Sequence, residues 1–194
     1  ILSHENVASR APVYESYDKN VQGRVVNERG KTNAGVVAPF DSKKFPKEIK
    51  DDCFSAALAH NPSIGKIDPY LVAQHAVIEA CAKTVSVGAS PLALTDCLCF
   101  GNPEKPEQMW QFSQSCVAIR EACSLLHFNG TDNLPIVAGN VSFYNQSGDQ
   151  SIPASPMIGC FGRVSKEQVL MNGFKSGDAN IYLVGETPAF IGGS

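Results

Sequence analysis

Residues 92–126 read LALTDCLCFGNPEKPEQMWQFSQSCVAIREACSLL, and this stretch decides the fold class. Leu92–Phe100 is a nearly continuous apolar run with one carboxylate, Asp96, at its centre, which is typical of a strand covered on both faces. An amphipathic helix follows, because apolar residues then recur at spacings of three and four. These residues are Met109, Phe112, Cys116, Ile119, Cys123 and Leu126. The helix is expected to begin at Asn102–Pro103 or at Pro106.

The segments on either side continue this alternation of strands and helices. Asp68 and Pro69 predict an N-cap and a first helical position, and the helix is expected to run to Val87 because Gly88 follows. Arg24–Val26 is expected to reach a first strand. Further strands are expected at Ala34–Phe40, Cys53–His60, Ile136–Tyr144, Met157–Val164 and Asn180–Gly185. The pattern predicts an α+β domain over residues 1–171, with residues 172–194 opening a following domain.

Composition limits the classes of function. The chain has 194 residues, of which 43% are apolar and 18% charged, as in a domain with a sizeable core. The 19 acidic and 16 basic residues form no blocks, so the formal charge of -3 offers no attraction for nucleic acid or an anionic membrane. No apolar run reaches bilayer length and no signal peptide is recognisable. A cytoplasmic protein that acts on small molecules is expected.

The ends and the cysteines lead to two further expectations. The chain begins at Ile1 rather than at a methionine and stops at Ser194 just after Gly192–Gly193, so an internal piece of a longer protein is expected. The seven cysteines include no C-x-x-C pair, which favours free buried thiols over a metal site or disulfides. The four histidines are scattered, and no catalytic residue is predicted among them.

Polar residues inside apolar segments are the candidates for chemistry. A carboxylate such as Asp96 is costly in an apolar strand unless it is paired, hydrogen-bonded or metal-bound. The alternative is an aspartate at the strand end that caps a nearby turn. Gly139 permits close approach to the backbone, while Asn140 and Ser142 fall on one face of the strand. A simple β-bulge is the alternative. Gly101 leads into a helix whose N–H groups suit a phosphate, but an ordinary helix entrance fits equally well.

Several strings in the chain closely resemble the second half of the phosphoribosylformylglycinamidine synthases. The longest is Leu94–Glu107, and Trp110–Phe112 and Gly139–Asn145 continue the resemblance. Shorter matches bring most of the chain into it. They are Val13–Glu15, Tyr17–Asp18, Val21–Gln22, Asp68–Tyr70, Val87–Ala89, Ile158–Gly159 and Gly185–Thr187.

The resemblance implies a fold and an activity. The fold is the amino-terminal domain of the aminoimidazole-ribonucleotide-synthase-like superfamily, a mixed four-stranded sheet backed by helices that pairs into a barrel with a second copy. The activity is the ATP-dependent amidation of formylglycinamide ribonucleotide in purine biosynthesis. In that family, the positions of Asp96 and Gly139 line the ATP site, Asn140 is a magnesium ligand and Ser142 contacts the ribonucleotide.

The resemblance also implies partners. These are a glutaminase domain or subunit that supplies ammonia, and the first half of the synthetase, which holds the catalytic histidine and most magnesium carboxylates. The isolated chain is therefore expected to be inactive and to form a homodimer. Three places depart from the family: Cys99 replaces an asparagine, Leu71–Val72 replaces two glycines, and His127–Asn133 lengthens a connection.

Two other classes of function remain open. Sister enzymes such as aminoimidazole ribonucleotide synthase and selenophosphate synthetase share the fold and use ATP, but the string Phe100–Glu107 argues against them. A noncatalytic dimerisation and scaffold module is the second alternative.

Overall fold

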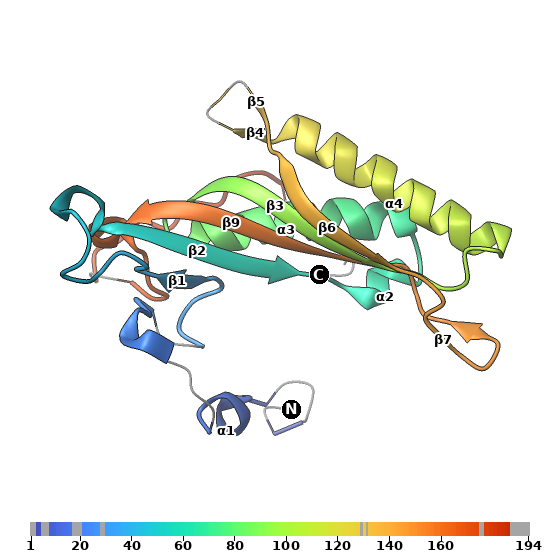
Figure 1. Cartoon of the computed structure of the whole chain (residues 1–194), viewed down its shortest axis with the longest axis horizontal. Helices are drawn as coiled ribbons and strands as arrows, with labels where there is room; N and C mark the ends of the chain where they lie inside the picture. Colours follow the sequence, from blue (N-terminus) through green and yellow to red (C-terminus); the bar gives the residue numbers. More distant parts are fainter. Residues whose placement is uncertain are drawn as a thin grey trace.

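In the computed structural model, five strands form one sheet in the order β1-β2-β9-β3-β6 (Figure 1). β3 and β6 run parallel while the other neighbours are antiparallel, so the sheet is mixed, as expected. The resemblance implied four strands, whereas this sheet has five. The three-residue edge strand β1 lies within the strand expected at Ala34–Phe40. The bounds are Gly35–Val37 (β1), Asp52–Ala59 (β2), Ser90–Cys99 (β3), Ile136–Ser142 (β6) and Ser155–Ser165 (β9).

The structure describes residues 3–4, 8–16, 21–27, 30–128, 130, 132–174 and 177–186. Within these ranges, two ribbons lie outside the main sheet, β4 with β5 and β7 with β8. The same ranges contain no helix that is long and apolar enough to cross a membrane. The ribbons are His127–Phe128 (β4) with Asp132–Asn133 (β5), and Gln146–Ser147 (β7) with Gln150–Ser151 (β8).

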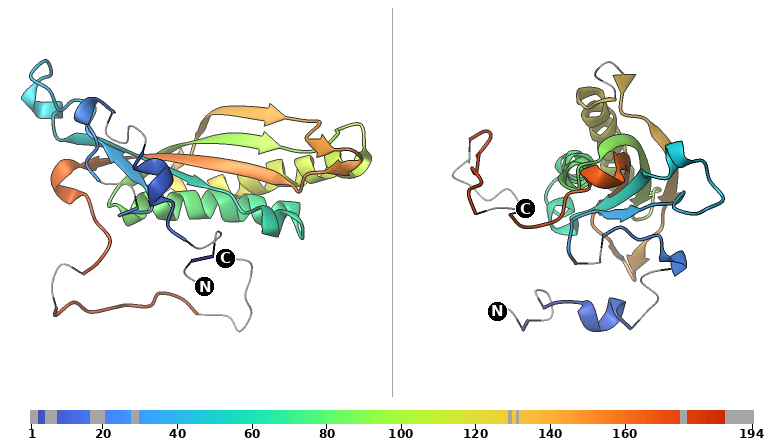
Figure 2. Two further views of the ribbon diagram at one scale, coloured as in Figure 1. Left: turned by 90° about the horizontal axis from the view of Figure 1, so that it is seen from below. Right: turned by 90° about the vertical axis from the view of Figure 1, so that its left-hand side faces the viewer.

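The two long helices, α3 (Pro69–Ser86) and α4 (Pro106–Leu125), lie on the same face of the sheet (Figure 2). α3 begins as expected, because the side chain of Asp68 accepts hydrogen bonds from the backbone amides of Tyr70 and Leu71 at 2.8 and 2.9 Å. α4 begins at Pro106, the later of its two expected starts. The short helices are Ala11–Tyr14 (α1), Val21–Gly23 (η1), Lys47–Ile49 (η2), Pro62–Gly65 (α2) and Lys166–Gln168 (η3).

The main core fills the space between the sheet and these helices. Phe100, Leu94 and Ile158 are fully buried there, and Phe100 makes an edge-to-face contact with Phe112 at 5.5 Å between ring centroids. Ser115, a buried polar residue of α4, is paired, because its hydroxyl donates to the backbone oxygen of Pro69 at 2.8 Å. The contacts of Phe100 and Ser115 therefore hold α4 against the end of β3 and the start of α3.

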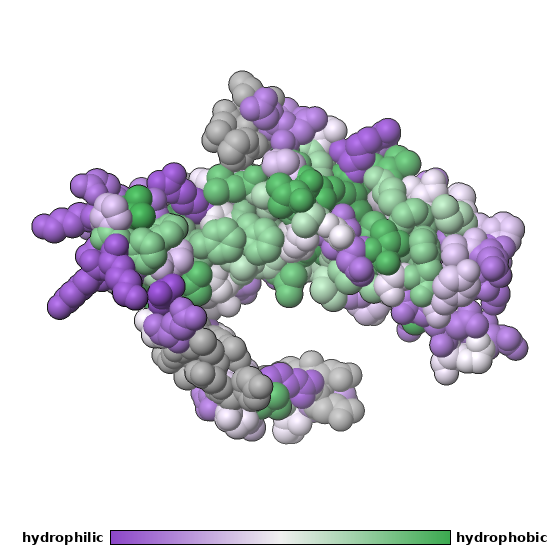
Figure 3. All heavy atoms as spheres, in the orientation of Figure 1, coloured by the Kyte–Doolittle hydropathy of each residue, from purple (hydrophilic) through white to green (hydrophobic). Residues whose placement is uncertain are grey.

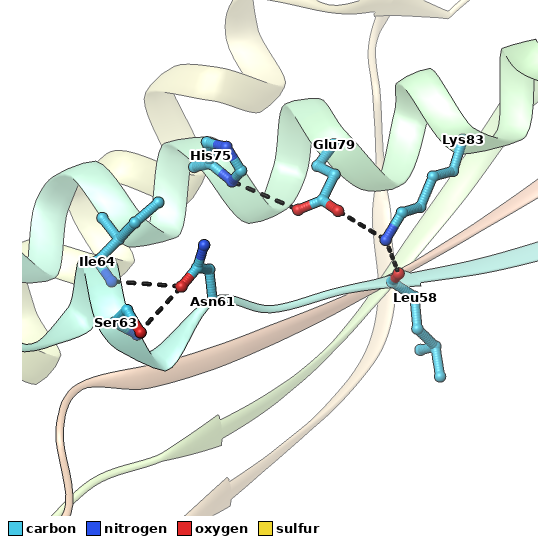
Figure 4. Close-up of polar contacts among 7 residues, drawn as sticks. All are labelled: Leu58, Asn61, Ser63, Ile64, His75, Glu79 and Lys83. Carbon is cyan, nitrogen blue, oxygen red and sulfur yellow. Dashed lines mark hydrogen bonds and ion pairs between the residues drawn. The ribbon is translucent and has the colours of Figure 1, made fainter. Parts of the chain in front are cut away.

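The side of α3 next to β2 carries a row of polar contacts (Figure 4). Nδ1 of His75 lies 3.4 Å from Glu79, whose other oxygen lies 2.6 Å from Nζ of Lys83. Lys83 also donates to the backbone oxygen of Leu58 at 3.0 Å. Leu58 lies in the part of β2 that follows the residues paired with β1. Lys83 thus ties α3 to β2, and His75 lies at the other end of this row.

Four expectations about local structure need correction. The long helices cover only one face of the sheet, so Cys97 and Cys99 of β3 are half-buried rather than buried, and alternate residues of β2 are exposed (Figure 2). Met109 is 44% exposed, because the buried face of α4 is centred on Ser115 and Ile119 instead. Residues 180–185 form no strand, since none of the described strands pairs with them, and Val184 is 94% exposed. Arg24–Val26 contributes only an isolated bridge between Val25 and Val37.

Candidate nucleotide and metal site

Asp96 and Gly139 face each other across the parallel pair formed by β3 and β6. A Cβ atom built on Gly139 would lie 2.5 Å from Oδ1 of Asp96 and 2.8 Å from Oδ2, well inside the contact distance. The Asp96 carboxylate therefore occupies the space that any larger residue at position 139 would need. The two residues expected to line one site are brought together by strand register.

The carboxylate of Asp96 sits on the helix-facing side of the sheet and is half-buried. Burial raises the pKa of this carboxyl above its ordinary value, and a hydrogen bond from the backbone of Asn140 partly offsets the rise. No cationic side chain of the described residues forms an ion pair with Asp96. A carboxylate held in this way retains acceptor capacity for a ligand that donates hydrogen bonds.

A pocket of about 330 Å³ opens beside Asp96, between α4 and strands β3 and β6. Its walls are mainly apolar, with Leu98 from the sheet and Ile119 from the helix. Arg120 stands at the same pocket with a 74% exposed side chain. The remaining lining residues are Cys116, Cys123, Ser124, Asn133, Leu134 and Ile136. Mainly apolar walls with a few polar groups are typical of small-molecule sites.

The pocket residues on α4 were not singled out in the sequence as site residues. Cys116, Arg120 and Cys123 follow helical spacing, so they share one side of α4, and two of them belong to the predicted apolar stripe. That stripe signals a core-facing surface. Nothing in its spacing distinguishes a filled core from a pocket.

Asn140 and Ser142 lie on the opposite, open face of the sheet, beside Cys97 and Cys99 of β3. Nδ2 of Asn140 lies 3.6 Å from Sγ of Cys97. Ser142 is held by Asn145, whose amide donates to the backbone oxygen of Ser142 at 2.9 Å. The sequence predicted that Asn140 and Ser142 share a face, and the structure confirms it.

The four candidate residues thus form two pairs on either side of β6. Asp96 and Gly139 meet on the helix-facing side, whereas Asn140 and Ser142 meet on the open side. In the described part of the chain, β6 is an edge strand that pairs only with β3. A ligand that contacts both pairs must therefore pass along or around the free edge of β6.

Gly101 does not offer the free amide that a phosphate site would need. Its backbone N–H donates to Oε1 of Gln108 at 3.2 Å. Asn102 caps the next turn by accepting from the amide of Glu104 at 2.8 Å. This segment is a helix entrance, the alternative interpretation of the sequence.

The described residues also gather no group of three or more His, Cys, Asp or Glu side chains that could hold a metal ion. The amide oxygen of Asn140 is a ligand type that Mg²⁺ accepts.

Comparisons with known proteins point in one direction. The family model described as AIR synthase related protein, N-terminal domain, matches residues 32–164. The chain is 39% identical over 198 aligned residues to phosphoribosylformylglycinamidine synthase subunit PurL of Methanothrix thermoacetophila, covering 100% of this chain and 25% of that protein. It therefore spans about a quarter of the length of the curated relatives that it matches.

Solved structures agree with this. The chain superposes on Thermotoga maritima PurL complexed with ATP with a TM-score of 0.67 and 28% identity, over 84% of this chain and 24% of that one. The same values of TM-score and coverage, with 29% identity, hold for T. maritima PurL complexed with FGAR. The chain is similar to these T. maritima proteins, and the ATP and FGAR are bound to those proteins.

Proposed function

The chain belongs to the AIR synthase related proteins, N-terminal domain, and on that premise we propose that it forms a nucleotide-binding part of a phosphoribosylformylglycinamidine synthase. The whole enzyme would convert formylglycinamide ribonucleotide, ammonia from glutamine and ATP to formylglycinamidine ribonucleotide. The names of the relatives support this activity, as do the ATP and FGAR complexes of similar structures. The observation that carries the proposal is the contact of Asp96 with Gly139 beside the apolar pocket.

In this proposal the pocket under α4 takes the base of ATP. The apolar walls would pack against the faces of the purine, and Asp96 would accept a hydrogen bond from its exocyclic amine. Gly139 leaves room for the Asp96 carboxylate next to the free edge of β6. The phosphates would then extend toward the open face, where Asn140 lies.

Magnesium fits the open face through an oxygen ligand. Asn140 is exposed, and the long contact to Cys97 leaves its amide free to turn so that Oδ1 points outward. Mg²⁺ prefers oxygen ligands and keeps several of them from phosphates and water, which suits a site with one protein amide. When bound, the ion would neutralise charge on the phosphates. Ser142, fixed by Asn145, would orient the ribonucleotide.

The chain's own part in the reaction would be to bind and orient ATP and the ribonucleotide. ATP activates the amide oxygen of the substrate by phosphorylation, and ammonia then displaces phosphate, so positioning contributes more than a protein nucleophile. The proton-transferring groups would come from the first half of the synthetase, and the ammonia from a glutaminase domain or subunit. We place residues 1–171 in the nucleotide-binding domain and residues 172–194 at the start of the next domain, in a cytoplasmic enzyme.

The proposed magnesium role is tested by replacing Asn140 with leucine. Loss of one oxygen ligand is expected to weaken ATP binding by about tenfold, with part of the loss restored by additional Mg²⁺. The measurement is calorimetric titration of ATP at two magnesium concentrations. Ser142→Ala, on the same face, is the matched control and should bind ATP nearly as the parent does. If Asn140→Leu binds ATP and magnesium like the parent, Asn140 is structural.

The open face of the sheet supports a second role, as an assembly surface. Figure 3 shows apolar side chains gathered across this face, and Leu58 is 64% exposed there, Phe54 41% and Met157 38%. Phe54 and Phe161 stack on it at 5.3 Å between ring centroids. Exposed apolar patches of this kind mark association sites. We propose that this face packs against a second copy of the domain to form a barrel. In the isolated chain, a second molecule of the same chain would cover the face, which gives a symmetric dimer.

The dimer is tested by light scattering across a range of concentrations. The parent chain is expected to be a dimer, and Leu58→Asp to be a monomer, because a charge would be buried at the interface. Leu125→Asp is the control, since Leu125 is 76% exposed at the end of α4, away from the open face. A parent chain that remains strictly monomeric at high concentration would contradict the pairing. Dimers that persist unchanged in Leu58→Asp would contradict the choice of face.

A further inference from the structure

A polar pocket of about 660 Å³ lies at the end of the sheet where β2, β3 and β6 finish (Figure 1). These three strands run in the same direction, because β2 and β3 are each antiparallel to β9 and β6 is parallel to β3. The pocket is lined by Lys66, which follows α2, and by the β7–β8 ribbon with its flanking residues, Tyr144–Ser147 and Gln150–Pro153. It is distinct from the pocket beside Asp96, with which it shares no lining residue.

Local structure holds the backbone on both sides of this polar pocket. A Cβ atom on Gly65 would overlap the backbone oxygen of Ala154, so α2 packs closely against the chain that follows the ribbon. On the other side, Tyr144 has a φ of 59°, a left-handed conformation that is costly for a residue with a side chain. The backbone N–H of Tyr144 donates to the backbone oxygen of Gly101 at 3.0 Å and supports this turn.

The chemistry of the lining suits an anion. Lys66 is the one charged side chain that lines the pocket, and amide and hydroxyl groups make up most of the rest. Within the described part of the chain, the ammonium group of Lys66 has no hydrogen-bond or ion-pair partner. Glu104 accepts a hydrogen bond from the hydroxyl of Tyr144 at 3.4 Å, but it does not line the pocket. An unpaired ammonium group beside amide and hydroxyl donors can bind the oxygen atoms of a phosphate group.

The pocket adjoins the residue proposed to contact the ribonucleotide. Asn145 lines the pocket, and its Nδ2 donates to Oγ of Ser142 at 3.1 Å. A ribonucleotide that contacts Ser142 therefore has this pocket within reach of its phosphate group. A phosphate dianion loses water when it binds, so an opposite charge beside it favours binding. Phe54, Leu58 and Met157 of the open face do not line the pocket, so the site does not require that face to be uncovered.

We propose that this pocket binds the phosphate group of formylglycinamide ribonucleotide, with Lys66 as the residue that pairs with its charge. This assignment rests on the proposed function, because it takes the ribonucleotide as the ligand. Ser142 and Lys66 would then hold the substrate at two points, with Asn145 between them. Lys66 would contribute to the affinity for the ribonucleotide and to the selection of a phosphate ester, without contributing to ATP binding.

The test compares formylglycinamide ribonucleotide with the same molecule without its phosphate group, the nucleoside, by calorimetric titration into the purified chain. The parent is expected to bind the ribonucleotide more tightly. Lys66→Ala should weaken ribonucleotide binding by about tenfold, because one hydrogen bond between charged groups is lost. The same variant should bind the nucleoside and ATP as the parent does. Lys43→Ala is the control, since Lys43 is exposed and does not line the pocket.

Four results would overturn the assignment. They are a chain that does not bind the ribonucleotide, equal affinity of the parent for ribonucleotide and nucleoside, a folded Lys66→Ala variant that binds the ribonucleotide as the parent does, and an equal loss of ATP affinity in that variant. The last would assign the pocket to the phosphates of ATP. ATP titration of the parent separates this assignment from the proposed function: a chain that still binds ATP retains the nucleotide site, whereas a chain that binds neither ligand contradicts both.

Discussion

Replacing Asp96 with asparagine is expected to weaken ATP binding by about 10- to 100-fold, because one hydrogen bond between ATP and a charged group is lost. Asparagine keeps the shape of the side chain, so the pocket between α4 and β6 should remain. The measurement is calorimetric titration of ATP into both proteins in excess Mg²⁺. Asp132→Asn is a matched control, because Asp132 is an exposed residue of β5 that does not line the pocket.

The stability of the Asp96→Asn variant separates a binding role from a structural one. Because burial raises the pKa of Asp96 in the folded chain, the carboxyl favours folding most when it is protonated. That contribution is fully present below the unfolded-state pKa and is lost as pH rises through the folded-state pKa. Without ligand, Asp96→Asn should therefore be as stable as the parent or more stable near neutral pH.

Thermal unfolding across the acid range checks this sign. The stability of the parent relative to Asp96→Asn should fall as pH rises through the carboxyl range, and should level off above it. A variant that is less stable at neutral pH, yet binds ATP normally once folded, would show that Asp96 caps local structure, as the alternative interpretation of the sequence holds.

Replacing Gly139 with alanine is expected to reduce both ATP binding and stability. The new methyl group would lie 2.5 Å from Oδ1 of Asp96, so the carboxylate must leave its place. Overpacking of this kind costs about 1–3 kcal/mol of folding free energy. Displacement of Asp96 should also weaken ATP binding at least as much as Asp96→Asn does. The measurements are chemical denaturation and the same ATP titration.

A double substitution tests whether this clash is the cause. In an Asp96→Ala background the carboxylate is absent, so Gly139→Ala should cost much less stability than it does in the parent. Coupling between contacting residues is about 0.5–3 kcal/mol in such cycles. Additive effects of the two substitutions would show that Gly139 is required for another reason, such as backbone conformation.

Local signals in the sequence predicted the helices well. Asp68 followed by Pro69 marks the start of α3 by chemistry that acts within one turn, and the structure confirms the cap. The buried face of α4 was predicted less well, because Ser115 lies in the core and Met109 does not. A hydrogen bond to the backbone of Pro69 makes the buried serine tolerable, and apolar spacing does not reveal such a partner.

The layers of the sheet were harder to predict for a physical reason. Exposed positions of β2 such as Phe54 and Leu58 are apolar, so the strand shows no polar alternation that would mark an open face. β3 has the same property at Cys97 and Cys99. A surface kept apolar for a partner or a ligand therefore has the same sequence pattern as a strand buried on both sides.

The candidate residues were predicted individually, and their arrangement was not. The contact of Asp96 with Gly139, and the placement of Asn140 on the other face, depend on the parallel register of β3 and β6. That register includes an irregularity between Leu94 and Thr95, and a shift of one residue would exchange the two faces. This pairing joins two strands that α4 separates in the sequence, and no short motif encodes it.

Nucleotide binding by this chain is tested most directly by calorimetric titration of Mg²⁺-ATP into the purified chain, with CTP as the comparison nucleotide. We expect saturable binding of one ATP per chain, weaker binding of CTP, and a marked loss of ATP affinity in Gly139→Ala. A folded chain that shows no saturable binding of ATP, or that binds ATP equally well with and without the Gly139→Ala substitution, would contradict it.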